Sequence, residues 1–152
     1  GDGADASNLT ANLKHINKKY EEDFKKPINE NLEKIVSSSA ADESPIMESV
    51  QSVVVDSFIG NANIDKRLIL ISDLLQYTKE LNLYAGIPDF EQYKRSSHYR
   101  YVSSDLSGVK VEILTLRGKN RTAEQGSKLL NFWIQFLSEQ QVSNLKVKPV
   151  EG

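Results

Sequence analysis

The chain has no cysteine among its 152 residues, and it has no long uninterrupted apolar run. The absence of cysteine excludes disulfides, thiolate metal sites and cysteine nucleophiles together. Without an apolar run of about 20 residues, no segment is expected to span a bilayer. The polar start Gly-Asp-Gly-Ala-Asp is not a signal peptide either. The compartment stays open: we expect a soluble protein that is cytoplasmic, or periplasmic or secreted after loss of an N-terminal segment.

An excess of charge of one sign is also absent. Nineteen basic and 21 acidic residues give a formal net charge of −2, so the charge does not favour binding to nucleic acid or to an anionic membrane. With 39% hydrophobic and 26% charged residues, the chain can bury a core of its own. We therefore expect a single domain over residues 1–152, with residues 1–8 as a loose lead.

The most informative stretch is a short apolar run that ends at a carboxylate. The residues from Leu68 to Ile71 show no polar alternation, so both faces of this segment are expected to be buried, as in an interior parallel strand over residues 67–72. Ser72 and Asp73 then lie at its carboxyl end. In open α/β sheets ligands bind at that end, because the loops diverge there and leave a crevice.

Two more strands and a long final helix are predicted after this strand. Residues 109–116 alternate at first and are fully apolar later, and residues 145–150 alternate again. Thr122 and Gln125 match a capping box that opens the last helix, whose wide apolar face includes Trp133. We expect Trp133 to belong to the core.

Helices are predicted before the first of these strands. The first spans residues 9–25, because its apolar residues recur on one stripe. That stripe consists of Leu9, Leu13, Ile16, Tyr20 and Phe24. The second begins at Pro27, which suits a first helical turn. Its stripe consists of Ile28, Leu32 and Ile35.

A third helix over residues 45–58 follows, and Asp89 is expected to cap a short helix later in the chain. The alternation of helices with strands predicts an α/β fold, namely a three-layer, Rossmann-like, mostly parallel sheet flanked by helices.

Four stretches of the sequence resemble landmarks of a known family. They are Ser44-Pro45-Ile46-Met47-Glu48, Leu68 to Gln76, Leu106 to Val111, and Gln125 to Trp133. In order and spacing they are similar to a von Willebrand factor A-like (vWA-like) domain, most of all to an uncharacterised bacterial branch of that superfamily. The resemblance covers roughly residues 1–150 and implies a doubly wound α/β fold.

Domains of this family often hold Mg²⁺ at the top of the sheet, through a metal-ion-dependent adhesion site. The resemblance implies that Ser44 and Asp73 occupy two of the three places of that site. The third place is an Asp-x-Ser-x-Ser loop after the first strand, and Asp5-Ala6-Ser7 is only an accidental echo of it. The resemblance therefore suggests that the chain starts after the family's first strands and lacks that loop. With two protein ligands, Mg²⁺ is expected to bind weakly or not at all.

Each candidate residue has a structural alternative. Asp73 can cap the turn that follows it, and Ser44 is better explained as a helix cap. Ser72 can supply a second hydroxyl or can turn into the core. His15 and His98 have no companions at metal-site spacing, so both are expected at the surface.

A basic and aromatic group at residues 93–101 can stack on a phosphate or on a nucleic-acid strand. At this net charge, an ordinary solvated segment is the stronger interpretation.

The leading functional hypothesis is a non-catalytic protein-interaction module whose ligand surface is the top of the sheet. The sequence does not show the identity of the protein partner. The alternative is a metal-assisted phosphohydrolase that uses Asp73 at a strand end. Paired carboxylates at strand ends, a Gly-rich phosphate loop and a spaced Ser/His/Asp set are all missing from the sequence, so we expect no enzyme.

The absent first strand has a consequence for assembly. In the family that strand pairs with the strand that holds Leu68 to Ile71, so its loss would leave an apolar edge unpaired. We therefore expect a homodimer or larger assembly through that edge, or aggregation.

Overall fold

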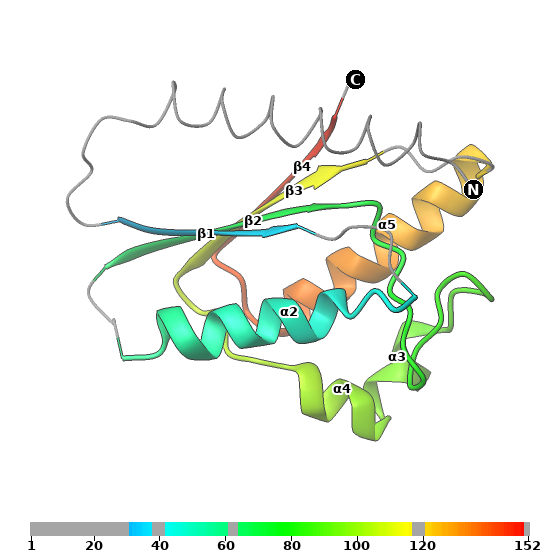
Figure 1. Ribbon diagram of the computed structural model, residues 1–152, viewed down its shortest axis with the longest axis horizontal. Coiled ribbons are helices and arrows are strands. Elements are labelled where there is room, and N and C mark those ends of the chain that lie inside the picture. Colours follow the sequence, from blue (N-terminus) through cyan, green and yellow to red (C-terminus); the bar gives the residue numbers. More distant parts are fainter. Residues whose placement is uncertain (1–30, 38–41, 61–63, 117–120, 151–152) are drawn as a thin grey trace.

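The computed structural model describes residues 31–37, 42–60, 64–116 and 121–150, and it has an α/β fold (Figure 1). The strands are β1 (Asn31–Ser37), β2 (Asp65–Ser72), β3 (Val109–Thr115) and β4 (Asn144–Pro149). The helices are α2 (Ile46–Val53), which continues into the π-helical turn η1 (Val54–Phe58), then α3 (Phe90–Lys94), α4 (Ser97–Val102) and α5 (Ala123–Glu139).

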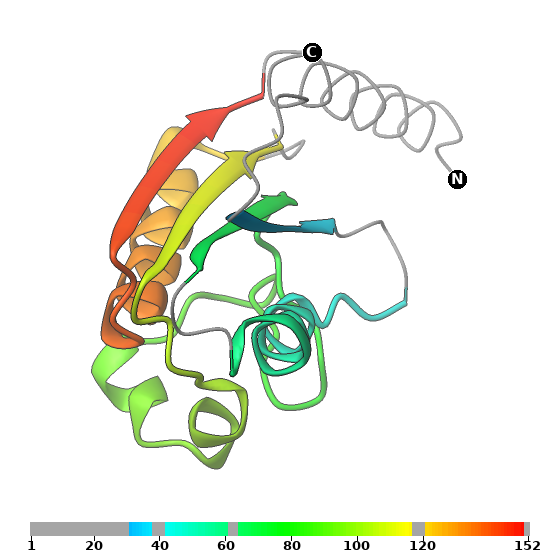
Figure 2. The same cartoon turned by 90° about the vertical axis from the view of Figure 1, so that its left-hand side faces the viewer.

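The four strands form one parallel sheet in the order β1-β2-β3-β4. Each crossover therefore steps to the next strand in the same direction, and crossovers of one hand then place their helices on one face of the sheet. Figures 1 and 2 show α2, α3, α4 and α5 on the same side of the sheet. The predicted α/β class with a parallel sheet is confirmed, and the described helices form one covering layer.

The prediction of an interior strand over residues 67–72 is confirmed by β2. This strand pairs with β1 on one side and with β3 on the other. All residues from Leu68 to Ser72 are buried. Continuous apolar sequence is what a parallel strand needs when neither of its faces is left to water.

Three of the predicted helix starts can be compared with the structure, and two are confirmed. Thr122 and Gln125 form the capping box of α5, and Asp89 caps α3 by accepting a hydrogen bond from the Gln92 backbone N–H. The predicted cap by Ser44 is wrong. Helix α2 begins at Ile46 with Pro45 in the cap position, where no side chain accepts a hydrogen bond from the helix.

The segment after Pro27 contains the main error of the sequence interpretation. A helix was predicted there, but Asn31–Ser37 is strand β1, which lies in parallel register along β2. Leu32, Ile35 and Val36 fit a helical stripe. In the strand, Leu32 and Val36 face the core and Ile35 faces the other side, and pairing with β2 is what favours the strand. The predicted helix over residues 9–25 lies outside the described residues.

Strand β1 fills the edge of β2 that was predicted to be open. The pairs run from Asn31 with Asp65 to Ser37 with Ile71. The prediction of an open edge along β2 is therefore wrong, and the predicted homodimer through that edge loses its physical reason. Strand β4 lies at the opposite edge of the sheet, as expected.

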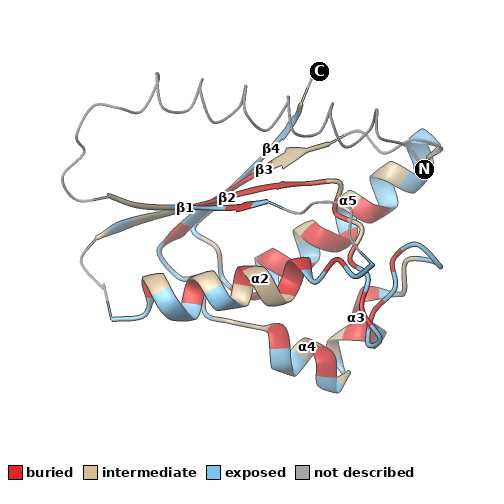
Figure 3. Ribbon diagram, in the orientation of Figure 1, coloured by how far each residue is buried: buried red, intermediate tan, exposed pale blue. Residues whose placement is uncertain are grey.

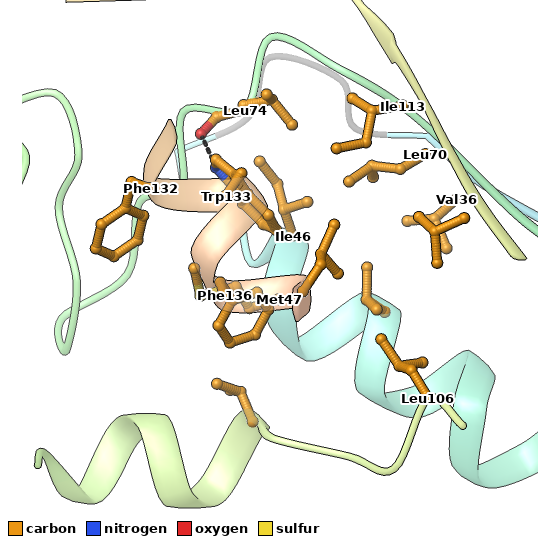
Figure 4. Close-up of a cluster of buried hydrophobic side chains, with 14 of the residues drawn as sticks. Val36, Ile46, Met47, Leu70, Leu74, Leu106, Ile113, Phe132, Trp133 and Phe136 are labelled. Atoms are coloured by element: carbon orange, nitrogen blue, oxygen red, sulfur yellow. Dashed lines mark hydrogen bonds between the residues drawn. The ribbon is translucent and has the colours of Figure 1, made fainter. Parts of the chain in front are cut away.

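The core lies between the sheet and its helix layer (Figure 3). Figure 4 shows Trp133 and Phe136 of α5 packed beside Ile46 and Met47 of α2, under Leu70 of the sheet. The predicted burial of Trp133 is confirmed. None of the helices in the described ranges has the length and apolar character that crossing a membrane requires.

Candidate interaction site at the carboxyl end of the sheet

A long irregular loop, residues 73–89, connects the carboxyl end of β2 to α3. Loops of about this length without helix or strand are uncommon in compact domains, and they are usually functional or disordered. This loop is ordered by hydrogen bonds from several elements. It also begins at the end of the sheet where the sequence predicts a ligand site.

The start of the loop is fixed by its own side chains and by α5. The Leu74 backbone N–H donates to Ser72 Oγ at 2.9 Å, and the Leu75 N–H donates to Asp73 Oδ1 at 3.0 Å. The Leu74 carbonyl accepts from Trp133 Nε1 at 2.8 Å (Figure 4). Leu74 has a left-handed φ of 66°, which costs a non-glycine residue about 1–2 kcal/mol. Such conformations persist only where the surroundings enforce them, and they are concentrated at functional sites.

The middle of the loop is joined to the segment before α2. Ser44 and Tyr77 exchange backbone hydrogen bonds of 2.9 and 3.0 Å in an antiparallel bridge, and a second bridge joins Tyr77 to Asn82. Asn82 Oδ1 then accepts from the backbone N–H groups of Tyr84 at 3.0 Å and Ala85 at 3.2 Å. The backbone that carries both tyrosines is thereby fixed.

A series of hydrogen-bonded polar side chains supports the loop. Gln76, which is fully buried, accepts from the Met47 N–H at 2.9 Å and donates to Glu48 Oε2 at 2.7 Å. Glu48 Oε1 contacts His98 Nε2 at 2.6 Å, and His98 Nδ1 contacts the Tyr93 hydroxyl at 2.9 Å. We call this the Gln76–Glu48–His98–Tyr93 chain. It joins the 73–89 loop to α2, α4 and α3.

Every nitrogen and oxygen of the side chains in the middle of this chain has a partner. Both ring nitrogens of His98 and both carboxylate oxygens of Glu48 are engaged. Desolvation, together with the nearby carboxylate of Glu48 and the ring of Tyr99, raises the pKa of Tyr93, so its hydroxyl keeps its proton. A hollow of about 610 Å³ adjoins Glu48 and His98, and both nitrogens of His98 are bonded to side chains of the protein. The chain is therefore a structural support for the loop.

Two tyrosines project from the supported loop toward solvent. Tyr77 is 39% exposed and Tyr84 is 61% exposed. Their rings meet edge to face, with centroids 6.0 Å apart and planes at 84°. Desolvation and the Asp73 carboxylate raise the pKa of Tyr84, while the Arg121 guanidinium lowers it. We call Tyr77, Tyr84, Asp73 and Arg121 the tyrosine platform.

The platform combines the residue types that dominate binding energy at protein interfaces. Tyrosine and arginine are enriched among such residues, and large aromatic rings give contact area with little loss of side-chain freedom. Arg121 Nη1 also donates to the Asp73 carbonyl at 3.3 Å, so it is held beside the loop. The arrangement can bind a partner surface through stacking, a phenol hydroxyl and one charge of each sign.

The two predicted metal ligands are held by different partners. Asp73 caps the turn that follows it through Oδ1, which confirms the structural alternative for this residue. Ser44 is buried in the bridge with Tyr77, and Ser72 accepts from the Leu74 N–H. Among the described residues, no three His, Cys, Asp or Glu side chains are grouped as for a metal ion.

His98 was expected at the surface, and this prediction is wrong because the side chain is buried between Glu48 and Tyr93. His98 and Val102 are the buried residues of α4, one turn apart. This spacing is the only local signal, since Glu48 lies 50 residues away in the sequence. His15 lies outside the described residues.

The basic and aromatic group at residues 93–101 does not form a stacking surface. Tyr93 is buried, and Tyr99 packs edge to face against Phe136 with centroids 6.1 Å apart. Lys94 forms an ion pair with Glu139 at 2.6 Å. Two of the three tyrosines of this group are thus packed against the core and only Tyr101 is exposed, which weakens the support for a nucleic-acid strand at this segment.

Comparison with protein-family models, with curated proteins and with solved structures found no match for this chain. The vWA-like resemblance therefore stays a prediction, and function is inferred from the geometry of the 73–89 loop.

Proposed function

We propose that this chain is a non-catalytic protein-interaction module of vWA-like type, and that its protein partner docks on the tyrosine platform. The observation that carries the proposal is the pair of exposed tyrosines on a loop held by hydrogen bonds from α2 and α5. Binding to a prearranged surface loses less conformational freedom than binding to a mobile one, so a rigid loop favours recognition. The proposal needs no metal ion.

The competing hydrolase hypothesis has less support from the same geometry. One carboxylate oxygen of Asp73 already accepts a backbone hydrogen bond. The neighbouring side chain of opposite charge, Arg121, contacts the Asp73 carbonyl. A hydrolytic carboxylate needs a second acid, a base or a metal beside it. Within the described residues, no three His, Cys, Asp or Glu side chains are grouped so that they could hold a metal ion.

A photo-crosslinking amino acid placed at position 84 tests the platform directly. The expected result is a covalent adduct with a specific partner protein when the full chain is irradiated in its native cells. Position 101 is the matched control, because Tyr101 is 65% exposed and lies on α4, outside the tyrosine platform. The same substitution at position 101 should give no adduct with that partner.

Affinity measurements then test the side chains. For the identified partner, Tyr84→Ala should weaken binding by about 30-fold or more, the effect of losing a central aromatic contact worth roughly 2 kcal/mol. Tyr101→Ala should change the affinity by less than about threefold. Adducts formed only from position 101, or equal effects of the two substitutions, would contradict the proposal. Hydrolytic turnover with Mg²⁺ that disappears in Asp73→Ala would support the hydrolase instead.

A further inference from the structure

The face of the sheet opposite the described helices carries an apolar patch. Strand alternation puts Ile35, Ile69, Ile71 and Leu114 on this second face, since Leu68, Leu70 and Val111 point into the core. The register places Ile35 beside Ile69 and Ile71 beside Leu114. These four residues, the second-face patch, span the three strands β1, β2 and β3.

The centre of the patch is buried and its edge is exposed. Ile69 is 3% exposed and Ile71 is 1% exposed, although Ile35 at the edge is 40% exposed. Side chains stand nearly perpendicular to a sheet, so neighbouring strands alone leave their outer ends open to water. The described helices all lie on the other face (Figure 2). Their layer therefore cannot be what buries Ile69 and Ile71.

Charged residues lie beside the patch on the same face. Arg67 pairs with Glu112 at 2.5 Å and with Glu33 at 3.7 Å, and Lys148 pairs with Glu112 at 3.3 Å. This row crosses all four strands. Lys110, next to Arg67 in the register, adds a positive charge toward the amino ends of the strands. A cover for this face must be apolar in one part and polar in another, where acidic residues would complement Lys110.

We propose that residues 9–24 of this chain cover the second face as an amphipathic helix, running antiparallel to β1. The predicted stripe of Leu9, Leu13, Ile16, Tyr20 and Phe24 supplies the apolar surface. A helix of that length is about 24 Å long, and a seven-residue strand such as β1 is about 23 Å long.

Chain order and charge select this cover over a second copy of the protein. The segment ends only a few residues before β1 begins, so it is present at high effective concentration near the face. In the antiparallel orientation, Glu21, Glu22 and Asp23 come near the amino ends of the strands. Lys110 provides positive charge there, beside the ion pairs of Arg67. The helix would complete a three-layer arrangement around the sheet.

Amine cross-linking of the unmodified full chain tests this placement. Lys14 and Lys18 lie off the apolar stripe, so they remain reactive when the stripe is buried. A short linker should join them to Lys146 or Lys148, which lie on the second face of β4 and are exposed. Lys128, exposed on α5, is the control on the opposite side and should give no link.

The same experiment on a mixture of isotopically light and heavy chains separates links within one chain from links between copies. Links within a chain to Lys146 or Lys148 support the proposal. Links that join a light chain to a heavy one would overturn it, because a second copy would then cover the face. Links to Lys128, or no links from Lys14 and Lys18, would also overturn it.

Because the chain has no native cysteine, a single introduced thiol can report the exposure of each face. Ile71→Cys reports the second face, and Val111→Cys reports the helix-covered face. Adding Ile16→Asp should speed thiol labelling at position 71 by about tenfold, as expected for opening of one layer. Labelling at position 111 should change by less than about threefold.

The control is Ala11→Asp, which introduces the same charge on the opposite side of the predicted helix. It should leave labelling at both positions unchanged. An unchanged rate at position 71 in Ile16→Asp would overturn the proposal. An equal rise at both thiols would mean that the whole chain unfolds, and the cross-links of the unmodified chain then decide.

Discussion

Replacing Trp133 with phenylalanine tests how firmly α5 holds the 73–89 loop. The indole Nε1 donates to the Leu74 carbonyl at 2.8 Å, and both residues are buried. Phenylalanine keeps an aromatic ring in the core but has no donor, so the carbonyl loses its partner away from water. The carbonyl belongs to a residue with a left-handed φ of 66°, a conformation that the surrounding contacts must enforce.

The expected loss of stability has two parts. A buried acceptor left without a partner costs about 1–3 kcal/mol. The smaller ring leaves a gap, and partial loss of a large side chain in a core adds roughly 1 kcal/mol. We therefore expect Trp133→Phe to lower the free energy of unfolding by about 2–4 kcal/mol. Phe136→Leu, at a buried neighbour whose ring meets that of Trp133 with centroids 5.6 Å apart, is the control for packing alone.

Urea unfolding followed by circular dichroism gives the stability, because the variant lacks the only tryptophan of the chain. Native-state hydrogen exchange gives the local effect. The amides of Gln76 and Tyr77 should exchange faster in Trp133→Phe than global unfolding predicts, whereas Phe136→Leu should change them only through global stability. Equal local protection in the two variants would refute the claim that the indole hydrogen bond fixes the loop.

Three further predictions concern other parts of the molecule. Desolvation raises the pKa of Glu112, but hydrogen bonds from Arg67 and Lys148 outweigh it and lower the pKa below its ordinary 4.5. The ionised carboxylate therefore adds stability that is present above pH 4.5 and is lost as the pH falls through the lowered pKa. Glu112→Gln should cost about 1.5–3 kcal/mol at pH 7 and should flatten the acid limb of a stability curve measured by urea unfolding. Thr122→Ala should cost about 1 kcal/mol through loss of the capping box, and Thr122→Ser should cost much less, as thermal unfolding will show. We expect calorimetry to show weak Mg²⁺ binding or none. A micromolar affinity for Mg²⁺ that Asp73→Ala abolishes would contradict the assignment of Asp73 to a turn.

The predictable parts of the fold were those that local pattern determines. The apolar run from Leu68 to Ile71 predicted an interior strand, because a half-exposed strand would alternate apolar with polar residues. Thr122 and Gln125 predicted the start of α5 because a capping box depends on neighbours three residues apart. Strand β1 was missed because Leu32, Ile35 and Val36 fit the helical period, and only pairing with β2, more than 30 residues later, makes the segment a strand.

The sequence predicted where the candidate site lies, but it did not predict which residues form it. The carboxyl end of β2 was expected to hold the ligand surface, because loops diverge at that end of a parallel sheet. The sequence emphasised Asp73 as a metal ligand, and the structure uses it to cap a turn. Tyr77 and Tyr84 gave no signal, since their edge-to-face contact depends on the backbone bridges of the loop.

The support of the loop explains why an irregular segment can serve as a binding surface. Fixing the backbone of each residue costs about 1–2 kcal/mol in lost conformational freedom, and a loop without helix or strand must offset this cost by other contacts. Contacts from outside include Trp133 of α5 at Leu74, Glu48 of α2 at Gln76, and Ser44 at Tyr77. Because these contacts are made during folding, a partner that docks on Tyr77 and Tyr84 does not have to order the loop itself.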